Sequence, residues 1–140
     1  MITGGCLCGS IRYEVHGALG RSVFCHCSRC RKASGSVAAF NAPVAAKDFS
    51  VVSGAELLKS YNADTGVERM FCANCGSQII SRRDKAPDVV RLRLGTLDSA
   101  PSRGPDAHIF VGSKIAWFDT RDGAPRFAEA PPPEFNRPLS

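Results

Sequence analysis

Hydrophobic and polar residues alternate in short segments along much of this chain. Ile11, Tyr13 and Val15 alternate with polar residues, and the segment 90–94 alternates valine or leucine with arginine. A period of two is typical of β-strands that bury one face. Other segments with strand character lie between Gly, Pro, Asn or Asp turn residues, at 36–40, 49–52, 57–61, 67–71, 77–81, 108–111 and 115–118.

No segment has the period of a long helix, so the pattern predicts an all-β protein. We expect one helical turn over 28–33, capped by Ser28, and a hairpin turn over 62–66. Prolines cluster from Pro125 onward. We therefore expect a single β domain over residues 1–124 and, over residues 125–140, an extended or disordered tail outside the core.

The chain has 140 residues, the size of one ordinary domain, and no apolar run near the ~18 residues that a membrane span requires. Its first residues carry no secretory signal, so we expect a soluble, cytoplasmic protein that binds no membrane. The formal charge of +5 would favour nucleic acid as a partner, but seven metal-bound thiolates and two Zn²⁺ ions would lower it to +2. Charge therefore gives no reason to expect nucleic-acid binding.

Seven cysteines form three tight clusters, and this grouping is the strongest chemical signal in the sequence. An odd number of cysteines cannot pair completely in internal disulfides, and closely spaced thiolates are typical of zinc sites. Tetrahedral zinc takes four such ligands at about 2.3 Å, usually from two turns. The clusters are the pair Cys6 and Cys8, the trio Cys25, Cys27 and Cys30, and the pair Cys72 and Cys75.

The two pairs together supply four ligands, which is a closed structural zinc site, whereas the trio surrounds a second zinc and leaves one position open. An open position is what catalytic zinc needs, so the trio is the candidate catalytic site. Three thiolates leave that site at net −1, which suits a soft thiol ligand better than acidification of water. We therefore expect activation of a small thiol for attack on a small electrophile. The structural ligands would be Cys6, Cys8, Cys72 and Cys75, and the catalytic ligands Cys25, Cys27 and Cys30.

Spacing alone leaves two other arrangements open. The C-x-x-C portion of the trio, Cys27 and Cys30, could join the second pair as a zinc ribbon, leaving the other three cysteines as ordinary thiols. Alternatively, a histidine could close the trio as an inert Cys₃His site. We expect the side chain of His26 to point away from the sulfurs, because it alternates with the cysteines on an extended turn. The histidine candidates are His16, His26 and His108.

Three motifs resemble those of a known family in their order and spacing. They are Gly4-Gly5-Cys6-Leu7-Cys8-Gly9, Cys25-His26-Cys27-Ser28-Arg29-Cys30 and Phe71-Cys72-Ala73-Asn74-Cys75-Gly76-Ser77. The family is that of the glutathione-dependent formaldehyde-activating enzymes, with S-hydroxymethylglutathione synthases and proteins like centromere protein V. Further positions look like its C-terminal signature: Gly95–Asp98, His108–Phe110, Ser113, Lys114 and Trp117.

The resemblance implies an all-β, tent-like fold with a structural zinc on the two pairs and a catalytic zinc on the trio. It also implies a carbon–sulfur lyase activity run in reverse, in which the thiol of glutathione adds to formaldehyde. The alternative is a non-enzymatic zinc module that binds glutathione or a protein partner. Basic residues could bind the carboxylates of glutathione, although exposed surface charge is the simpler interpretation of each. They are Arg31, Lys32, Arg82, Arg83, Arg91 and Arg93.

Other polar and aromatic residues have two interpretations each. His108 is a candidate proton shuttle, or a strand-end histidine with its hydrogen bonds satisfied. We expect one of Trp117 and Phe118 to point inward and the other outward. We expect Asp98 to make a turn contact rather than take part in catalysis.

Overall fold

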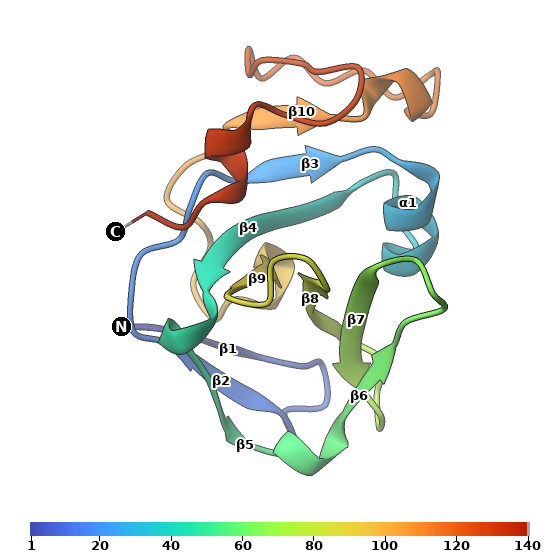
Figure 1. The fold of residues 1–140 in the computed structure, drawn as a ribbon. Coiled ribbons are helices and arrows are strands. Elements are labelled where there is room, and N and C mark those ends of the chain that lie inside the picture. The colour runs from blue at the N-terminus through green and yellow to red at the C-terminus, as the bar shows by residue number, and fades with distance from the viewer. Residues whose placement is uncertain (140) are drawn as a thin grey trace.

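Two β-sheets and one short helix make up the computed structural model, which describes residues 1–139 (Figure 1). The smaller sheet has three strands in the order β1-β2-β5, and the larger has seven in the order β10-β3-β4-β9-β8-β7-β6. Neighbouring strands are antiparallel except for β10 and β3, which are parallel. The all-β, tent-like fold expected from the sequence is confirmed.

The bounds of the elements are as follows. The smaller sheet consists of β1 (Ile2–Gly5), β2 (Arg12–Val15) and β5 (Phe49–Ser53). The larger sheet consists of β3 (Val23–Cys25), β4 (Ala39–Ala45), β6 (Leu58–Tyr61), β7 (Val67–Cys72), β8 (Gln78–Arg83), β9 (Val89–Arg93) and β10 (Ala107–Ile109). Helix α1 covers Ser28–Ser34, and the short 3₁₀ helices are η1 (Ala46–Asp48), η2 (Ala55–Leu57), η3 (Leu94–Thr96), η4 (Val111–Ser113) and η5 (Pro133–Asn136). Within residues 1–139, no helix is long and apolar enough to cross a membrane.

Most strands lie where the alternation predicts them, and the exceptions have physical reasons. The pattern does not predict β1, which is rich in glycine; a Cβ at Gly4 would lie 2.3 Å from Tyr13 Oη, so this close approach requires glycine. Strand β3 is too short to show a period, and the segment 115–118, expected as a strand, forms turns instead. Helix α1 is longer than the expected single turn, and Cys27 rather than Ser28 is its N-cap.

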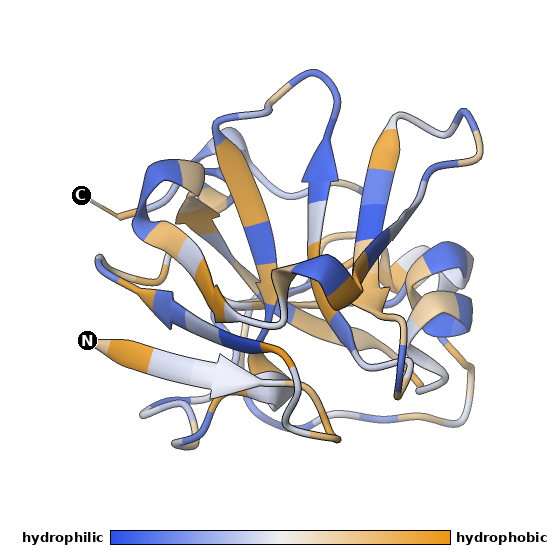
Figure 2. Ribbon diagram, turned by 90° about the horizontal axis from the view of Figure 1, so that it is seen from below, coloured by the Kyte–Doolittle hydropathy of each residue, from blue (hydrophilic) through white to orange (hydrophobic). Residues whose placement is uncertain are grey.

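The main core lies between the smaller sheet and one face of the larger sheet. Tyr13 and Val15 of β2 belong to the same buried cluster as Val44, Val90 and Leu92 of the larger sheet. Figure 2 shows the alternation as orange and blue bands along the strands. Because side chains alternate across a strand, the two arginines of β9 point to the opposite face of the larger sheet. That face carries the candidate site.

The C-terminal segment lies against the domain, which corrects the expectation of a tail outside the core. Figure 1 shows it alongside β10, where Phe127 donates its backbone N–H to the carbonyl oxygen of His108 at 2.9 Å. The rings of Phe127 and Phe135 meet edge to face at 5.8 Å and pack against a second buried cluster. Prolines favour extended backbone, but they do not prevent neighbouring aromatic side chains from docking. The second cluster consists of Val23, Cys25, Ala107 and Ile109.

A Phe127→Ala substitution should therefore destabilise the domain. Truncation of a fully buried phenylalanine costs about 3–5 kcal/mol, and because Phe127 is only partly buried we expect a loss of about 2 kcal/mol in the free energy of unfolding. Urea unfolding measures this change. Trp117→Ala is the control, because Trp117 is 76% exposed and should change stability by less than about 0.5 kcal/mol. Equal effects of the two substitutions would contradict the docking of the C-terminal segment.

Candidate functional site: two cysteine clusters and an arginine-lined cavity

The first candidate metal site joins the N-terminal strands to β7. Cys6 and Cys8 follow β1, Cys72 ends β7, and Cys75 lies in the turn after it; their four Sγ atoms all lie within 4.8 Å of one another. Cys6 Sγ is 3.5 Å from Cys8 Sγ, which is 3.9 Å from Cys72 Sγ. Four sulfurs at about 2.3 Å from a tetrahedral ion are about 3.8 Å apart. The sulfur spacing therefore fits one tetrahedral metal ion.

Two similar turns hold these four sulfurs. The carbonyl oxygen of Cys6 accepts the N–H of Gly9 at 3.1 Å, and that of Cys72 accepts the N–H of Gly76 at 2.8 Å. Both glycines have a left-handed backbone conformation, with φ of 78° and 80°, in which a residue with a side chain would be strained. Hydrogen bonds from the hydroxyl and backbone of Ser77 lower the pKa of Cys75 to about 5, so this thiol is ionised at neutral pH, as metal binding requires.

The trio forms a second candidate metal site at the end of β3. Cys25 ends that strand, Cys27 caps α1, and Cys30 lies in the first turn of the helix. Cys27 Sγ accepts the backbone N–H of Cys30 at 3.3 Å. The three Sγ atoms lie within 4.8 Å of one another, and within the described part of the chain no histidine joins the group. The geometry thus supports neither the ribbon pairing nor a closed Cys₃His site.

The pKa values of Cys25 and Cys30 shift in opposite directions because the two thiols interact. A hydrogen bond from Cys25, assisted by Cys27 and by the charges of Arg69 and Arg93, lowers the pKa of Cys30 to about 5. The same interaction, together with burial, raises the pKa of Cys25. The trio therefore carries negative charge at neutral pH, and the neighbouring arginines stabilise that charge.

A cavity of about 360 Å³ opens beside the trio. The beginning of α1 bounds one side, and β4, β9, β8 and β7 bound the other with the face that points away from the main core. All three cysteines of the trio line it, and no aspartate or glutamate among the described residues does. Its charged lining, here called the arginine cluster, consists of Arg29, Arg69, Arg83, Arg91 and Arg93.

The members of the arginine cluster differ in burial: Arg29 and Arg83 are exposed, Arg69 and Arg91 are half-buried, and Arg93 is buried. Their positive charges repel one another. Burial, followed by repulsion from Arg83 and Arg93, lowers the pKa of Arg91 to about 10. Burial likewise lowers the pKa of Arg93, which is 7% exposed. Both remain charged at neutral pH, so the cavity has a positive potential that favours an anionic ligand.

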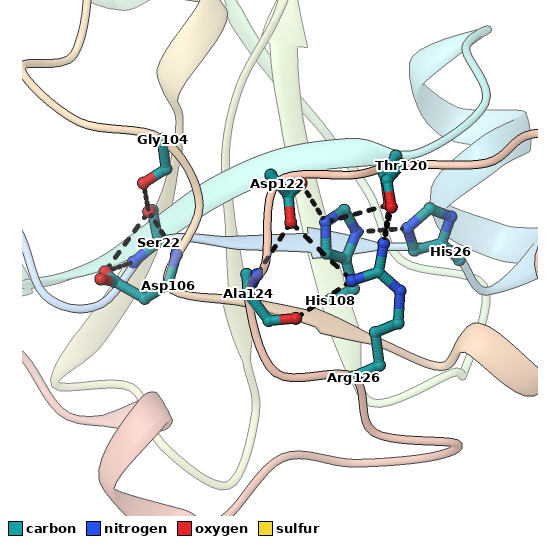
Figure 3. Close-up of polar contacts among 9 residues, drawn as sticks. All are labelled: Ser22, His26, Gly104, Asp106, His108, Thr120, Asp122, Ala124 and Arg126. Carbon is teal, nitrogen blue, oxygen red and sulfur yellow. Dashed lines mark hydrogen bonds and ion pairs between the residues drawn. The ribbon is translucent and has the colours of Figure 1, made fainter.

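Hydrogen bonds connect His26, in the loop that carries the trio, through His108 to Asp122, in the loop before the C-terminal segment (Figure 3). His26 Nε2 lies 2.9 Å from His108 Nδ1, and His108 Nε2 lies 2.6 Å from Asp122 Oδ2. An ionised carboxylate only accepts, so His108 donates to Asp122 from Nε2 and, when neutral, accepts from His26 at Nδ1. Burial, followed by repulsion from His108, lowers the pKa of His26 to about 4 and keeps the ring neutral.

These hydrogen bonds distinguish between the two interpretations of His108. Both of its ring nitrogens are engaged and it does not line the cavity, so it is a histidine with its hydrogen bonds satisfied, which positions the loop that carries the trio. His26 is buried and bonded to His108 instead of joining the sulfur group. Its side chain thus does not join the sulfurs, in agreement with the expectation from its alternation with the cysteines.

A His108→Phe substitution should destabilise the protein measurably. It keeps a ring that can stack on Phe24, 5.4 Å away, but leaves the buried Nε2 of His26 without a partner. An unsatisfied buried donor costs about 1–3 kcal/mol, so we expect urea unfolding to report a loss of about 2 kcal/mol. His16→Phe is the matched control, because its side chain is 55% exposed. A similar loss in both variants would contradict the positioning role.

The basic residues named from the sequence divide into three groups. Arg83, Arg91 and Arg93 line the cavity, whereas Arg82 forms an ion pair with Glu68 at 3.7 Å and Arg31 donates to the carbonyl oxygen of His26. Lys32 lines a neighbouring cavity. Sequence reasoning missed Arg29 and Arg69; the place of Arg29 inside the trio motif was the one available signal, whereas Arg69 had none.

The remaining candidates lie away from the cavity. Asp98 accepts hydrogen bonds from Arg12 and Thr3, which ties the segment after β9 to β1 and β2; these are contacts between distant segments rather than the expected turn contact. Trp117 points outward, and Phe118 points inward with its ring 6.2 Å from that of His26. The expectation of one inward and one outward ring is confirmed.

Comparisons with known proteins agree with the motifs. The family described as "Glutathione-dependent formaldehyde-activating enzyme" matches residues 1–113. A Halomonas elongata protein whose name assigns it provisionally to that activity is 32% identical over 130 residues, which cover 85% of this chain and 80% of the relative. The crystal structure of a Rhodobacter sphaeroides protein is similar with a TM-score of 0.62 and 30% identity, covering 72% of this chain and 92% of that one. The chain therefore belongs to the glutathione-dependent formaldehyde-activating enzyme family.

Proposed function

We propose that this protein is a zinc-dependent carbon–sulfur lyase, acting as a synthase, that adds the thiol of glutathione to formaldehyde. The observation that carries the proposal is the group of three sulfurs beside a cavity that, within residues 1–139, is lined by five arginines and by no aspartate or glutamate. Family membership supports glutathione and formaldehyde as the reactants. A reducing compartment such as the cytoplasm would keep the seven thiols available for metal.

Both sulfur groups fit zinc, because soft thiolates at tetrahedral spacing are the ligands that zinc prefers. We assign one zinc to a structural role in the site of four cysteines and a second zinc to a catalytic role in the trio. When bound by the trio, zinc would supply the Lewis acidity that lowers the pKa of an incoming thiol. The structural ligands are Cys6, Cys8, Cys72 and Cys75, and the catalytic ligands are Cys25, Cys27 and Cys30.

The residues around the trio contribute binding and orientation. The arginine cluster attracts an anionic thiol and holds its sulfur beside the trio, which raises the effective concentration of the nucleophile. In the addition, a bond forms between the thiol sulfur and the carbon of formaldehyde while the C=O π bond breaks. The proton of the thiol ends on the new hydroxyl oxygen, so no oxidant or reductant is needed.

Exchange spectroscopy by NMR tests this proposal, because glutathione and formaldehyde also combine spontaneously. With ¹³C-formaldehyde at equilibrium, we expect the protein to accelerate exchange between free formaldehyde and the adduct, with saturation in glutathione and no change in the equilibrium ratio. A rate that stays at the spontaneous value while glutathione binds would contradict an enzyme and favour a binding module.

A further inference from the structure

One face of the larger sheet carries polar side chains where a buried sheet normally carries apolar ones. Asn41 of β4 lies directly opposite Arg93 of β9, and Arg91 lies opposite Ser81 of β8, which in turn lies opposite Arg69 of β7. All five line the cavity beside the trio. They form a continuous polar row across four strands, here called the polar row.

The negative charge of the trio offsets only part of the positive charge of the arginine cluster. Within the described part of the chain, no aspartate or glutamate lies within 4.0 Å of any member of the arginine cluster. Arg91 donates to the neutral side chain of Asn136, and Arg93 makes one long contact, 3.4 Å, from Nη1 to the carbonyl oxygen of Arg91. Buried charges are normally paired, so this arrangement suits a site whose counter-charge arrives with a ligand.

Two buried atoms of the row lack any hydrogen-bond partner among the residues that the structure describes. They are Arg93 Nε, a donor, and Asn41 Oδ1, an acceptor, on residues that are 7% and 3% exposed. The two residues lie directly opposite each other on β4 and β9, so their side chains are on the same face of the sheet. An α-amino-acid group complements them, since its carboxylate accepts from the arginine and its ammonium donates to the amide oxygen.

A second cavity gives room for a ligand longer than the first cavity holds. It has a volume of about 530 Å³ and shares Arg29 and Arg69 with the first cavity. Lys32 and Tyr61 also line it, and no acidic residue in the described range 1–139 does. A thiol with a second carboxylate could therefore place one anionic end on the polar row and direct the other toward this cationic opening.

We propose that Arg93 and Asn41 bind the α-amino-carboxylate group of the thiol substrate, and that Arg69 and the remaining arginines bind its second carboxylate. The inference rests on the proposed function and makes it selective: the site takes a dicarboxylate thiol with a free amino-acid end, of which glutathione is an example. Neutral thiols of similar size are poor ligands. Selectivity of this kind follows because an uncharged ligand leaves the arginine charges and both buried atoms without partners.

Calorimetric titration with S-methylglutathione tests this site, because that probe keeps both carboxylates and the ammonium but has no free thiol. We expect the zinc-loaded protein to bind it, and to bind its dimethyl ester about 10–100-fold more weakly, as the loss of charge-assisted hydrogen bonds predicts. Arg93→Gln should weaken binding of the diacid by a similar factor but hardly change binding of the ester. Equal affinity for acid and ester would overturn the proposal.

Two further variants keep the test decisive. Arg93 is buried, so Arg93→Gln can fail to fold. Arg69→Gln, at a half-buried position on the same row, provides a second test and should also weaken binding of the diacid. Arg82→Gln is the matched control, because Arg82 pairs with Glu68 and does not line the cavity. We expect its affinity to equal that of the wild type. Circular dichroism confirms that each variant is folded, and an unchanged affinity in folded Arg69→Gln and Arg93→Gln would refute the site.

The binding experiment and the exchange experiment test the two proposals separately. Accelerated exchange of formaldehyde together with equal affinity for acid and ester would refute the carboxylate site and leave the proposed function standing. Selective binding of the diacid without accelerated exchange would refute the proposed function and leave the carboxylate site standing.

Discussion

A chain with the substitution Cys72→Ser is expected not to fold. Cys72 is fully buried, ends β7, and belongs to the group of four sulfurs that connects this strand to the N-terminal strands. A structural zinc contributes on the order of 10 kcal/mol, whereas a whole domain has a stability of about 5–15 kcal/mol. Loss of this ligand therefore removes most or all of the net stability.

Circular dichroism and the yield of monodisperse protein measure this effect. Ala73→Ser is the matched control, because it places the same hydroxyl one residue later in the same turn, at an exposed position that is not a ligand. We expect the control to fold normally. A Cys72→Ser chain that folds with near-native stability would show that the site of four cysteines does not hold the fold together.

Cys27→Ser should have the opposite profile, with the fold retained and activity lost. Cys27 is the N-cap of α1 and accepts the N–H of Cys30, and serine is one of the best residues at that position, so the helix keeps its cap. The substitution nevertheless removes one of three thiolates from the proposed catalytic zinc. Loss of residues that only support metal ligands costs about 10–100-fold, so loss of a ligand itself should reduce the catalysed rate by about 100-fold or more.

The exchange rate of formaldehyde measures this loss, and thermal unfolding measures the fold in the same sample. Ser34→Ala, at the other end of α1, should change neither quantity much, because Ser34 is exposed and lies outside the cavity. If Cys27→Ser unfolds the protein as completely as Cys72→Ser, the division into a structural and a catalytic site is wrong. If it is folded and fully active, the trio is not the site of reaction.

The sequence located the three cysteine clusters, because short C-x-C and C-x-x-C turns constrain local geometry, but spacing alone left open which clusters meet in one site. Alternation located β2 and β9 for a similar reason, since one face of each strand packs in the main core. Strand β1 gave no such signal, because glycine occurs there to allow close approach of Tyr13. The sequence pattern thus predicts the features that depend on neighbouring residues, such as cysteine turns and strands with one buried face.

The cavity could not be predicted in the same way, because tertiary packing creates it. Arg91 and Arg93 alternate with apolar residues and have the pattern of a solvent-facing strand surface. In the fold, the loop of the trio and the beginning of α1 cover that surface, and the arginines become the wall of a cavity. The docking of Phe127 was hidden for a related reason, since a proline-rich composition does not reveal where a single aromatic ring packs.

The most direct test of two separate sites, one structural and one open to a thiol, is native mass spectrometry of the purified protein with glutathione. We expect a compact protein with two zinc ions that retains one glutathione, because the trio leaves a position for the thiol and the arginine cluster binds its carboxylates. A compact protein with one zinc ion, or with two zinc ions and no retained glutathione, would contradict an open thiol-binding site at the trio.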